Sequence, residues 1–234
     1  MKIQRTKFVL AIAILGATTA SAQHRMNREE PGAGDHPRLS KGQIAPILEG
    51  LGNHHHAITA KDERAQLFFN QGLRLAYGFN HKEADRAFRE AARLDPDCAM
   101  AYWGMAFVNG PNLNMPMDSE GGKAAYKAIR KALKAAKKVS EPERSYIEAL
   151  AKRFAKDPKA ERAPLDQAYA DAMRMVHEKY PDDLDAATLY ADALMNLSPW
   201  NYWTRDGQPR PNTPKILELF ESVIARDMDH AGAH

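Results

Sequence analysis

Apolar residues recur at helical spacing along most of the chain after residue 59. In the first clear stretch they lie on one face of a helix, at Ala65, Phe68, Phe69, Gly72, Leu73 and Ala76. The segment "GFNH" interrupts this pattern, and a second stripe follows at Ala84, Ala87, Phe88, Ala91 and Leu94. Asn80 with Glu83 fits a capping box at the start of the second helix, and Asp95-Pro96 ends it.

The spacing of these two helices is typical of a tetratricopeptide module, which fills about 34 residues with two antiparallel helices. Gly72 stands at the small position of the first helix when Ala65 is counted as its first residue. The A-x3-F-x2-A run of the second helix is Ala84, Phe88 and Ala91, and Pro96 closes the module. Small and aromatic residues at these positions let the two helices approach and interlock.

Three looser helix pairs follow, so we divide the array at residues 65–98, 99–140, 141–183 and 184–234. Ser140 with Glu143 predicts a helix start, and Thr213 before Pro214 predicts another. Long insertions at 109–122 and 198–212 separate the helices of the second and fourth pairs. The pattern predicts an all-α, right-handed α-solenoid over residues 59–234. No polar capping helix follows the last pair, so we expect a truncated array or a partner that covers its end.

The first 22 residues have the form of a secretory signal. Lys2, Arg5 and Lys7 precede a short apolar run, and Ala20-Ser21-Ala22 fits a signal-peptidase site. The apolar run is too short to span a bilayer. We therefore expect a periplasmic or secreted protein without membrane insertion after cleavage, which begins with a flexible or irregular segment at residues 23–58.

Charge and cysteine content exclude several classes. The chain has 33 Lys and Arg residues against 30 Asp and Glu residues, and three of the basic ones lie in the signal. The remainder is balanced, which gives no case for nucleic-acid binding or general membrane attraction. The single cysteine, Cys98, provides no disulfide framework, and we interpret it as a small buried residue at a helix start rather than a reactive thiol.

Several motifs together resemble a group of exported bacterial tetratricopeptide-repeat proteins. They are "LGNHHH", "GFNHKEADRAFREAARLDPDCAMAYWG", "GPNLNMP", "YPDDLDAATLYADALM" and the terminal "HAGAH". The resemblance covers residues 51–234 and implies the fold and the exported location. It implies no particular activity.

Histidines give one candidate for chemistry. In an extended segment His54 and His56 point to one side and His55 to the other. His230 and His234 would share a face if they lay on a helix. With His81 in the first turn, these histidines form a candidate zinc or copper set, although an open solenoid would keep its first and last modules far apart. The alternative is a solvated or hydrogen-bonded loop that binds no metal. Met115 and Met117 suit Cu(I), but we favour a packing role for them.

The second candidate is a surface for a protein or peptide partner. Repeat geometry places five residues on the concave side, namely Gln66, Phe69, Leu73, Trp103 and Phe107. The insertions add amide and aromatic side chains, which either bind a partner or seal the loops: Asn109, Asn112, Asn114, Trp200, Tyr202 and Trp203.

Motifs for catalysis are absent from the sequence. It contains no nucleophile elbow, no phosphate-binding glycine loop and no HExxH. Asp182, Asp183 and Asp185 form an acidic helix start, which helix dipoles commonly favour. The lysine-rich helix at 123–138 fits a solvated face rather than a membrane surface. We therefore expect a scaffold without a cofactor that binds a protein or peptide and is not an enzyme, with metal binding as the alternative.

Overall fold

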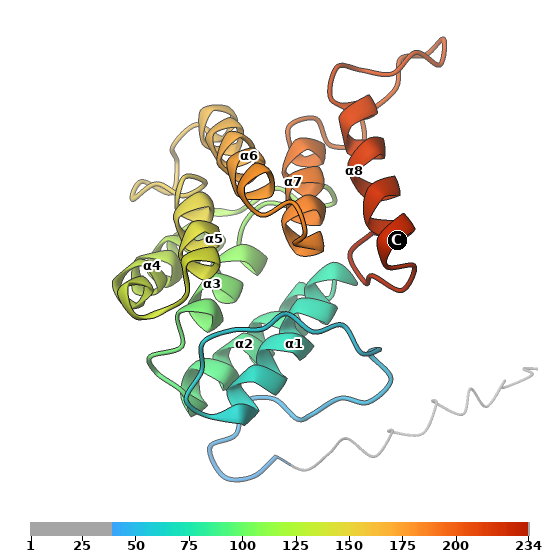
Figure 1. The fold of residues 1–234 in the computed structure, drawn as a ribbon. Helices are drawn as coiled ribbons and strands as arrows, with labels where there is room; N and C mark the ends of the chain where they lie inside the picture. The colour runs from blue at the N-terminus through green and yellow to red at the C-terminus, as the bar shows by residue number, and fades with distance from the viewer. Residues whose placement is uncertain (1–38, 234) are drawn as a thin grey trace, which may run out of the picture. The chain divides into compact units, whose positions relative to one another are not determined.

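The computed structural model describes residues 39–233, so the predicted signal, most of the leader and His234 lie outside the described residues. The described part is all-α, as expected, and Figure 1 shows its helices in chain order. They are α1 (Glu63–Tyr77), α2 (His81–Leu94), α3 (Ala99–Val108), α4 (Ser119–Ala135), the 3₁₀ helix η1 (Ala136–Lys138), α5 (Glu141–Ala151), α6 (Arg162–Lys179), α7 (Leu184–Asn196) and α8 (Thr213–Arg226). None of these helices has the length and apolar character needed to cross a membrane.

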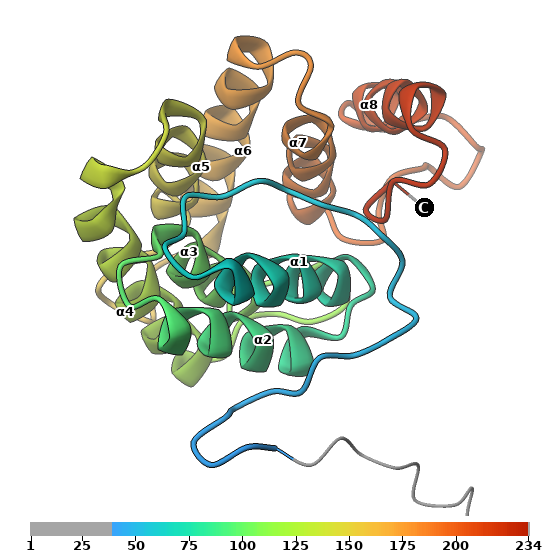
Figure 2. The same cartoon turned by 60° about the horizontal axis from the view of Figure 1, so that its bottom comes forward.

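Consecutive helices pack as pairs, and each pair packs on the next. The pairs are α1 with α2, α3 with α4, α5 with α6 and α7 with α8, and α2–α3, α4–α5 and α6–α7 contacts join them. Figures 1 and 2 show this progression from α1 to α8. The two insertions lie between α3 and α4 and between α7 and α8, as the sequence predicts.

The Phe88 ring joins the first two pairs. It is fully buried, and it lies against two glycines, Gly72 of α1 and Gly104 of α3. A methyl group at Gly72 would come within 2.6 Å of the ring, and one at Gly104 would come closer still. Because neither helix presents a side chain at the contact, α1 and α3 can both approach α2 closely. This is the interlock that the small and aromatic pattern predicts.

The predicted helix starts lie close to the observed ones, but not every predicted side-chain cap is present. The capping box of Ser140 and Glu143 at α5 is confirmed. The predicted box at Asn80 is wrong, because Asn80 precedes α2 without a side-chain cap and Glu83 pairs with Arg86 instead. Thr213 does not cap α8 either. Asn212 stands at that position, and the Thr213 hydroxyl donates to the Tyr202 carbonyl.

The segment before α1, residues 43–61, is irregular, but hydrogen bonds attach it to the helices. Figures 1 and 2 show the chain before α1 running back along that helix. Its backbone N–H groups donate to side chains instead of to a strand or helix: Ile44 to Glu90, Leu48 to Gln71, His56 to Asn70, Ile58 to Gln66, Thr59 to Glu143 and Lys61 to Asp95. We call residues 43–61 the leading segment. Its path satisfies polar side chains of α1 that would otherwise be buried without partners.

We expect Cys98 to resist alkylation in the folded protein. The side chain is buried at the N-cap of α3, as the sequence predicts, and burial raises the pKa of its thiol to about 11. Because the thiolate is the nucleophile, iodoacetamide at mildly alkaline pH should react at least about 100-fold more slowly than with the chain in urea. Mass spectrometry of timed samples measures both rates, and equal rates would contradict the burial.

Candidate metal centre

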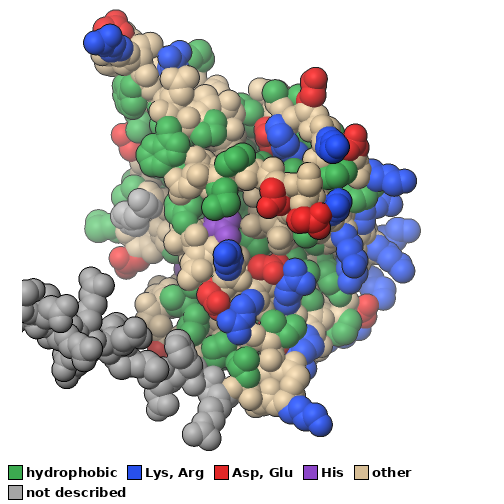
Figure 3. Space-filling view, turned by 180° about the vertical axis from the view of Figure 1, so that it is seen from behind, with side chains coloured by type: hydrophobic (Ala, Val, Ile, Leu, Met, Phe, Trp, Pro, Cys, Tyr) green, Lys and Arg blue, Asp and Glu red, His purple; other side chains and the backbone are tan. Residues whose placement is uncertain are grey.

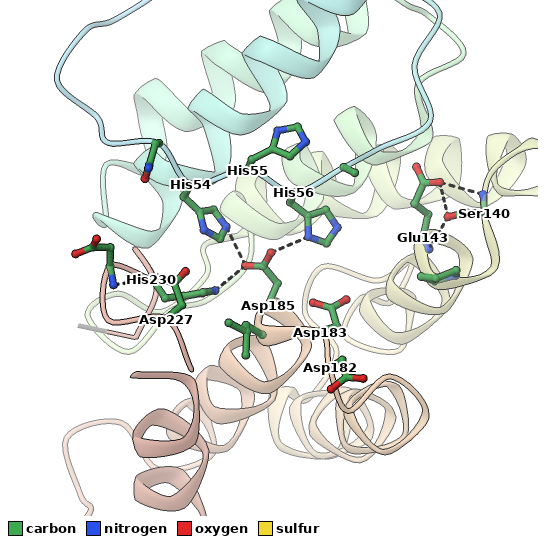
Figure 4. Close-up of a pocket in the computed structure, with 15 residues that line it drawn as sticks. His54, His55, His56, Ser140, Glu143, Asp182, Asp183, Asp185, Asp227 and His230 are labelled. Carbon is green, nitrogen blue, oxygen red and sulfur yellow. Dashed lines mark hydrogen bonds and ion pairs between the residues drawn. The ribbon is translucent and has the colours of Figure 1, made fainter. Parts of the chain in front are cut away.

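The leading segment directs two of the three adjacent histidines toward Asp185. His54 Nε2 lies 3.1 Å from Asp185 Oδ1, and His56 Nδ1 lies 2.7 Å from Oδ2. His55 points the other way, where Asn70 contacts its Nδ1 at 2.8 Å. Figure 4 shows this alternation, which the sequence predicts for an extended segment.

Asp185 is the centre of the cluster, and it lies in the first turn of α7. Asp183 caps this helix by accepting from the Ala186 N–H, which fixes the backbone that carries Asp185. The Asp185 carboxylate is 5% exposed, and the Tyr77 hydroxyl donates to its Oδ1 at 2.5 Å. In the sequence, nothing distinguishes Asp185 from other acidic residues at helix starts.

His230 reaches the same carboxylate from the other end of the described chain. Its Nε2 lies 3.4 Å from Asp185 Oδ1, and its ring centroid is 4.7 Å from that of His54. An open solenoid would hold the histidines of its two ends far apart, but here His54 and His230 meet at one carboxylate. The leading segment crosses toward α7, and the turn after α8 brings His230 to the same place. His230 lies in that turn and not on a helix.

His81 lies apart from this cluster. Its ring stacks on Phe79, and its Nδ1 lies 3.3 Å from the Val108 carbonyl oxygen. It belongs to neither of the residue groups in the described chain whose ligand atoms lie close enough to share an ion. These groups are His54, Asp185 and His230, and His56, Asp183 and Asp185. His234 lies outside the described residues.

Hydrogen bonding separates the two groups. In the first group, the buried Nε2 atoms of His54 and His230 have no hydrogen-bond partner within residues 39–233, although both lie near Asp185 Oδ1. In the second group, His56 bonds to Asp185 Oδ2, and Asp183 accepts from Tyr146 and from the backbone. Buried polar atoms normally have partners. The two nitrogens of the first group thus contact Asp185 Oδ1 at ion-pair distance without good hydrogen-bond geometry, an arrangement that a shared ion would satisfy, whereas the second group is hydrogen-bonded.

The distances of the first group also fit a metal ion. Zinc binds imidazole nitrogen and carboxylate oxygen at about 2.0–2.2 Å, so two ligand atoms of a tetrahedral site lie roughly 3.3 Å apart. The His54 and His230 nitrogens lie 3.1 and 3.4 Å from the Asp185 oxygen. Little movement would be needed for one ion to contact all three atoms.

The contacts around Asp185 keep its carboxyl ionised. Burial opposes ionisation of Asp185, but contacts with His230, His54 and His56 hold the pKa of its carboxyl well below the usual value. Burial opposes protonation of His56, but the hydrogen bond to Asp185 and nearby carboxylates raise its pKa. Burial and Asp185 raise the pKa of Tyr77 well above its usual value, so Tyr77 remains a donor.

The cluster opens into an acidic cavity of about 680 Å³. Six of the residues that line it are carboxylates, namely Glu143, Asp182, Asp183, Asp185, Asp227 and Asp229, and the lining described here includes no Lys or Arg. A cation can approach the cluster from this side, and one coordination position of an ion there would face the cavity.

The expected partner groove lies under the protein's own chain. Phe69, Leu73 and Trp103 are buried in the core, with at most 2% of each side chain exposed. Phe107 stacks on Trp103. Gln66 bonds to the backbone of the leading segment at His56 and Ile58. Phe107 is half-buried and also lines a second cavity.

The insertion residues are divided between local bonding and the surface. Asn109 donates to Asp85 and to the Met105 carbonyl, and Asn112 accepts from the backbone of Asn114 and Met115. Trp200 and Trp203 are exposed, and Tyr202 is half-buried.

The methionines and the basic helix lie outside the cluster. Met117 packs against the core, whereas Met115 is exposed, and neither lines the acidic cavity. Figure 3 shows Lys and Arg side chains gathered at one edge, on the side of α4. The basic residues of α4 and η1 are exposed, as predicted for a solvated face: Lys123, Lys127, Arg130, Lys131, Lys134, Lys137 and Lys138.

Comparisons with protein-family models, curated proteins and solved structures found no match. The function must therefore be argued from the site itself.

Proposed function

We propose that this protein binds a divalent metal ion through His54, Asp185 and His230. One observation carries the proposal: two buried imidazole nitrogens without hydrogen-bond partners lie on the same carboxylate oxygen. Two histidines and one carboxylate are a ligand set that leaves a tetrahedral ion one further position. The acidic cavity beside the three residues would give water or another small ligand access to that position.

Two neighbouring residues orient the carboxylate. His56 holds Asp185 Oδ2 at 2.7 Å, and Tyr77 donates to Oδ1 at 2.5 Å. Such contacts fix the direction in which a ligating oxygen points. His54 is therefore a proposed ligand, whereas His56 positions the Asp185 carboxylate.

His230 must change its protonation pattern when it binds metal. Its Nδ1 lies 3.2 Å from the Gly232 nitrogen and accepts from that N–H, which leaves the proton of a neutral ring on Nε2. Ligation through Nε2 would require the proton on Nδ1, which could then no longer accept from the Gly232 N–H. The turn after α8 is thereby linked to metal binding.

Zinc fits this ligand set best, and Cu(II) is the alternative. Imidazole and carboxylate suit both ions, whereas Cu(I) prefers sulfur ligands. Met115 and Met117 do not line the cavity beside the cluster. A copper site at His54 and His230 would therefore hold the oxidised ion.

We further propose that the helix pairs form a right-handed, tetratricopeptide-like solenoid in an exported protein. The support is the order of packed pairs, the Phe88 interlock and the form of residues 1–22. A role in binding a protein or peptide receives less support, because the leading segment lies along α1 where an extended peptide would bind.

Elemental analysis of untagged protein tests the metal proposal. After incubation with zinc and removal of free ion, we expect about one metal per chain in the wild type and less than about a tenth of that in the His54→Ala/His230→Ala double variant. His55→Ala is the matched control, because His55 is the adjacent histidine that points away from Asp185. A wild type without bound zinc or copper, or a double variant that binds as much as the wild type, would refute the proposal.

A further inference from the structure

A second cavity of about 320 Å³ lies between the end of α1, helices α7 and α8, and the two insertions. Its lining is mainly aromatic and aliphatic, and it includes Tyr77, Phe79, Phe107, Leu113, Trp200 and Phe220. The volume lies at the lower end of the range for small-molecule sites. Residues from both insertions line this cavity. We call the lining residues together the wall of the cavity.

One polar group in this wall has no partner. Thr188 of α7 lines the cavity with 2% of its side chain exposed, and its hydroxyl makes no hydrogen bond to any described residue. A buried hydroxyl without a partner costs free energy that a hydrogen bond would recover. A ligand with a hydroxyl group would supply that bond.

Backbone strain at the same cavity is the second observation. Among residues 39–233, only two residues other than glycine have positive φ, Phe79 at 57° and Trp200 at 59°. Both line the cavity, and their side chains are 50% and 72% exposed. Bulky residues adopt this conformation at a cost, and such strain gathers at functional sites. Here the strain keeps two aromatic rings at the edge of an apolar cavity.

The ionisable groups of the wall indicate an uncharged ligand. Burial raises the pKa of Asp192 and lowers that of His81. The described lining contains no Lys or Arg for an anionic ligand, and its one carboxyl group, Asp192, already accepts a hydrogen bond from Asn196. The features available for recognition are the aromatic rings, the buried Thr188 hydroxyl and the amides of Asn112 and Asn114.

We propose that this cavity binds a small, neutral, aromatic molecule that carries one hydroxyl group. The ring of the ligand packs against the aromatic wall that Phe79 and Trp200 extend, and its hydroxyl bonds to Thr188. The site shares Tyr77 with the metal centre, because the Tyr77 ring lines the cavity and its hydroxyl bonds to Asp185. Ligand binding does not require the metal, so it can be measured independently of metal binding.

Calorimetric titration with 1-naphthol, in the presence of EDTA, tests the site. We expect saturable binding below about 1 mM by the wild type. Trp200→Ala should weaken it at least about fivefold through loss of stacking area, and Trp203→Ala should leave it unchanged. Trp203 is the matched control, since it is an exposed tryptophan of the same insertion that does not line the cavity.

Thr188→Val tests the hydrogen bond, because valine keeps the shape of threonine and removes the hydroxyl. We expect the variant to bind 1-naphthol on the order of fivefold more weakly and naphthalene unchanged. Circular dichroism confirms that each variant is folded. Absence of saturable binding by the wild type, equal binding by Trp200→Ala and wild type, or equal loss for both probes in Thr188→Val would overturn the proposal.

Discussion

Replacing Asp185 with alanine is expected to abolish metal binding and to destabilise the metal-free protein by about 3–5 kcal/mol. The carboxylate is buried, and Tyr77 and His56 make hydrogen bonds to it while His54 and His230 lie at ion-pair distance. Alanine leaves all four polar groups facing an apolar methyl group. The same change removes the oxygen that the proposed ion shares with both histidines.

Thermal unfolding with and without zinc separates these two effects. Free zinc at about 100 times its dissociation constant stabilises the folded wild type by about 2.7 kcal/mol. For a domain of this size, that corresponds to a rise in Tm of about 5–10 °C. Asp185→Ala should unfold at lower temperature in EDTA and show no rise with zinc.

Asp183→Asn is the control for this prediction. Asp183 precedes Asp185 by two residues in the same helix start, and its contacts are a helix cap and the Tyr146 hydroxyl. Asparagine keeps the helix cap through Oδ1, and its NH2 group can donate to the Tyr146 oxygen in place of the bond that Asp183 accepts, so the variant should keep the zinc response. A zinc response that persists in Asp185→Ala, or that disappears equally in Asp183→Asn, would show that Asp185 is not the shared ligand.

The helices were predictable because their signals are local. The apolar stripes of α1 and α2 follow from the 3.6-residue period, and the small residue at Gly72 with Phe88 follows from the repeat pattern. The capping box of α5 needs only Ser140 and Glu143, three residues apart. The cap at Asn80 failed for an equally local reason, since Glu83 bonds to Arg86 one turn later.

The candidate site was predictable only in part. Alternation in an extended segment placed His54 and His56 on one side, but no sequence pattern joined them to His230. That contact depends on the paths of two irregular segments, whose backbone groups bond to side chains rather than in a repeating ladder. Asp185 gave no distinctive signal, because acidic residues are common in the first turn of helices.

One available signal was missed in α1. Asn70 and Gln71 are buried, and with Gln66 they bond to the leading segment. Polar side chains on a helix that is otherwise well packed require partners. Their spacing therefore indicated that an extended chain lies along α1. The concave side expected to hold a partner is the side along which the leading segment runs.

A methyl group at Gly104 is expected to have opposite effects with and without the Phe88 ring. In the wild type, Gly104→Ala would push a methyl group into that ring, which should destabilise the fold by about 1–3 kcal/mol. Phe88→Ala alone should cost about 3–5 kcal/mol, because the ring is fully buried between α1 and α3. Once the ring is gone, Gly104→Ala should stabilise by about 1 kcal/mol through the higher helix propensity of alanine and partial filling of the cavity.

Urea unfolding of the two single variants and the double variant measures this reversal as a coupling energy between positions 88 and 104. Gly122→Ala is the control, because Gly122 also lies in a helix, but a methyl group there meets the flexible end of Met117 at 3.1 Å and Pro158 at an ordinary contact distance of 3.5 Å. Its effect should be small and independent of Phe88. If Gly104→Ala destabilises both backgrounds equally, the ring is not what requires glycine, and the close approach of α2 and α3 has another cause. A reversal of sign would instead show that one aromatic ring between two glycines determines how the first two helix pairs pack together.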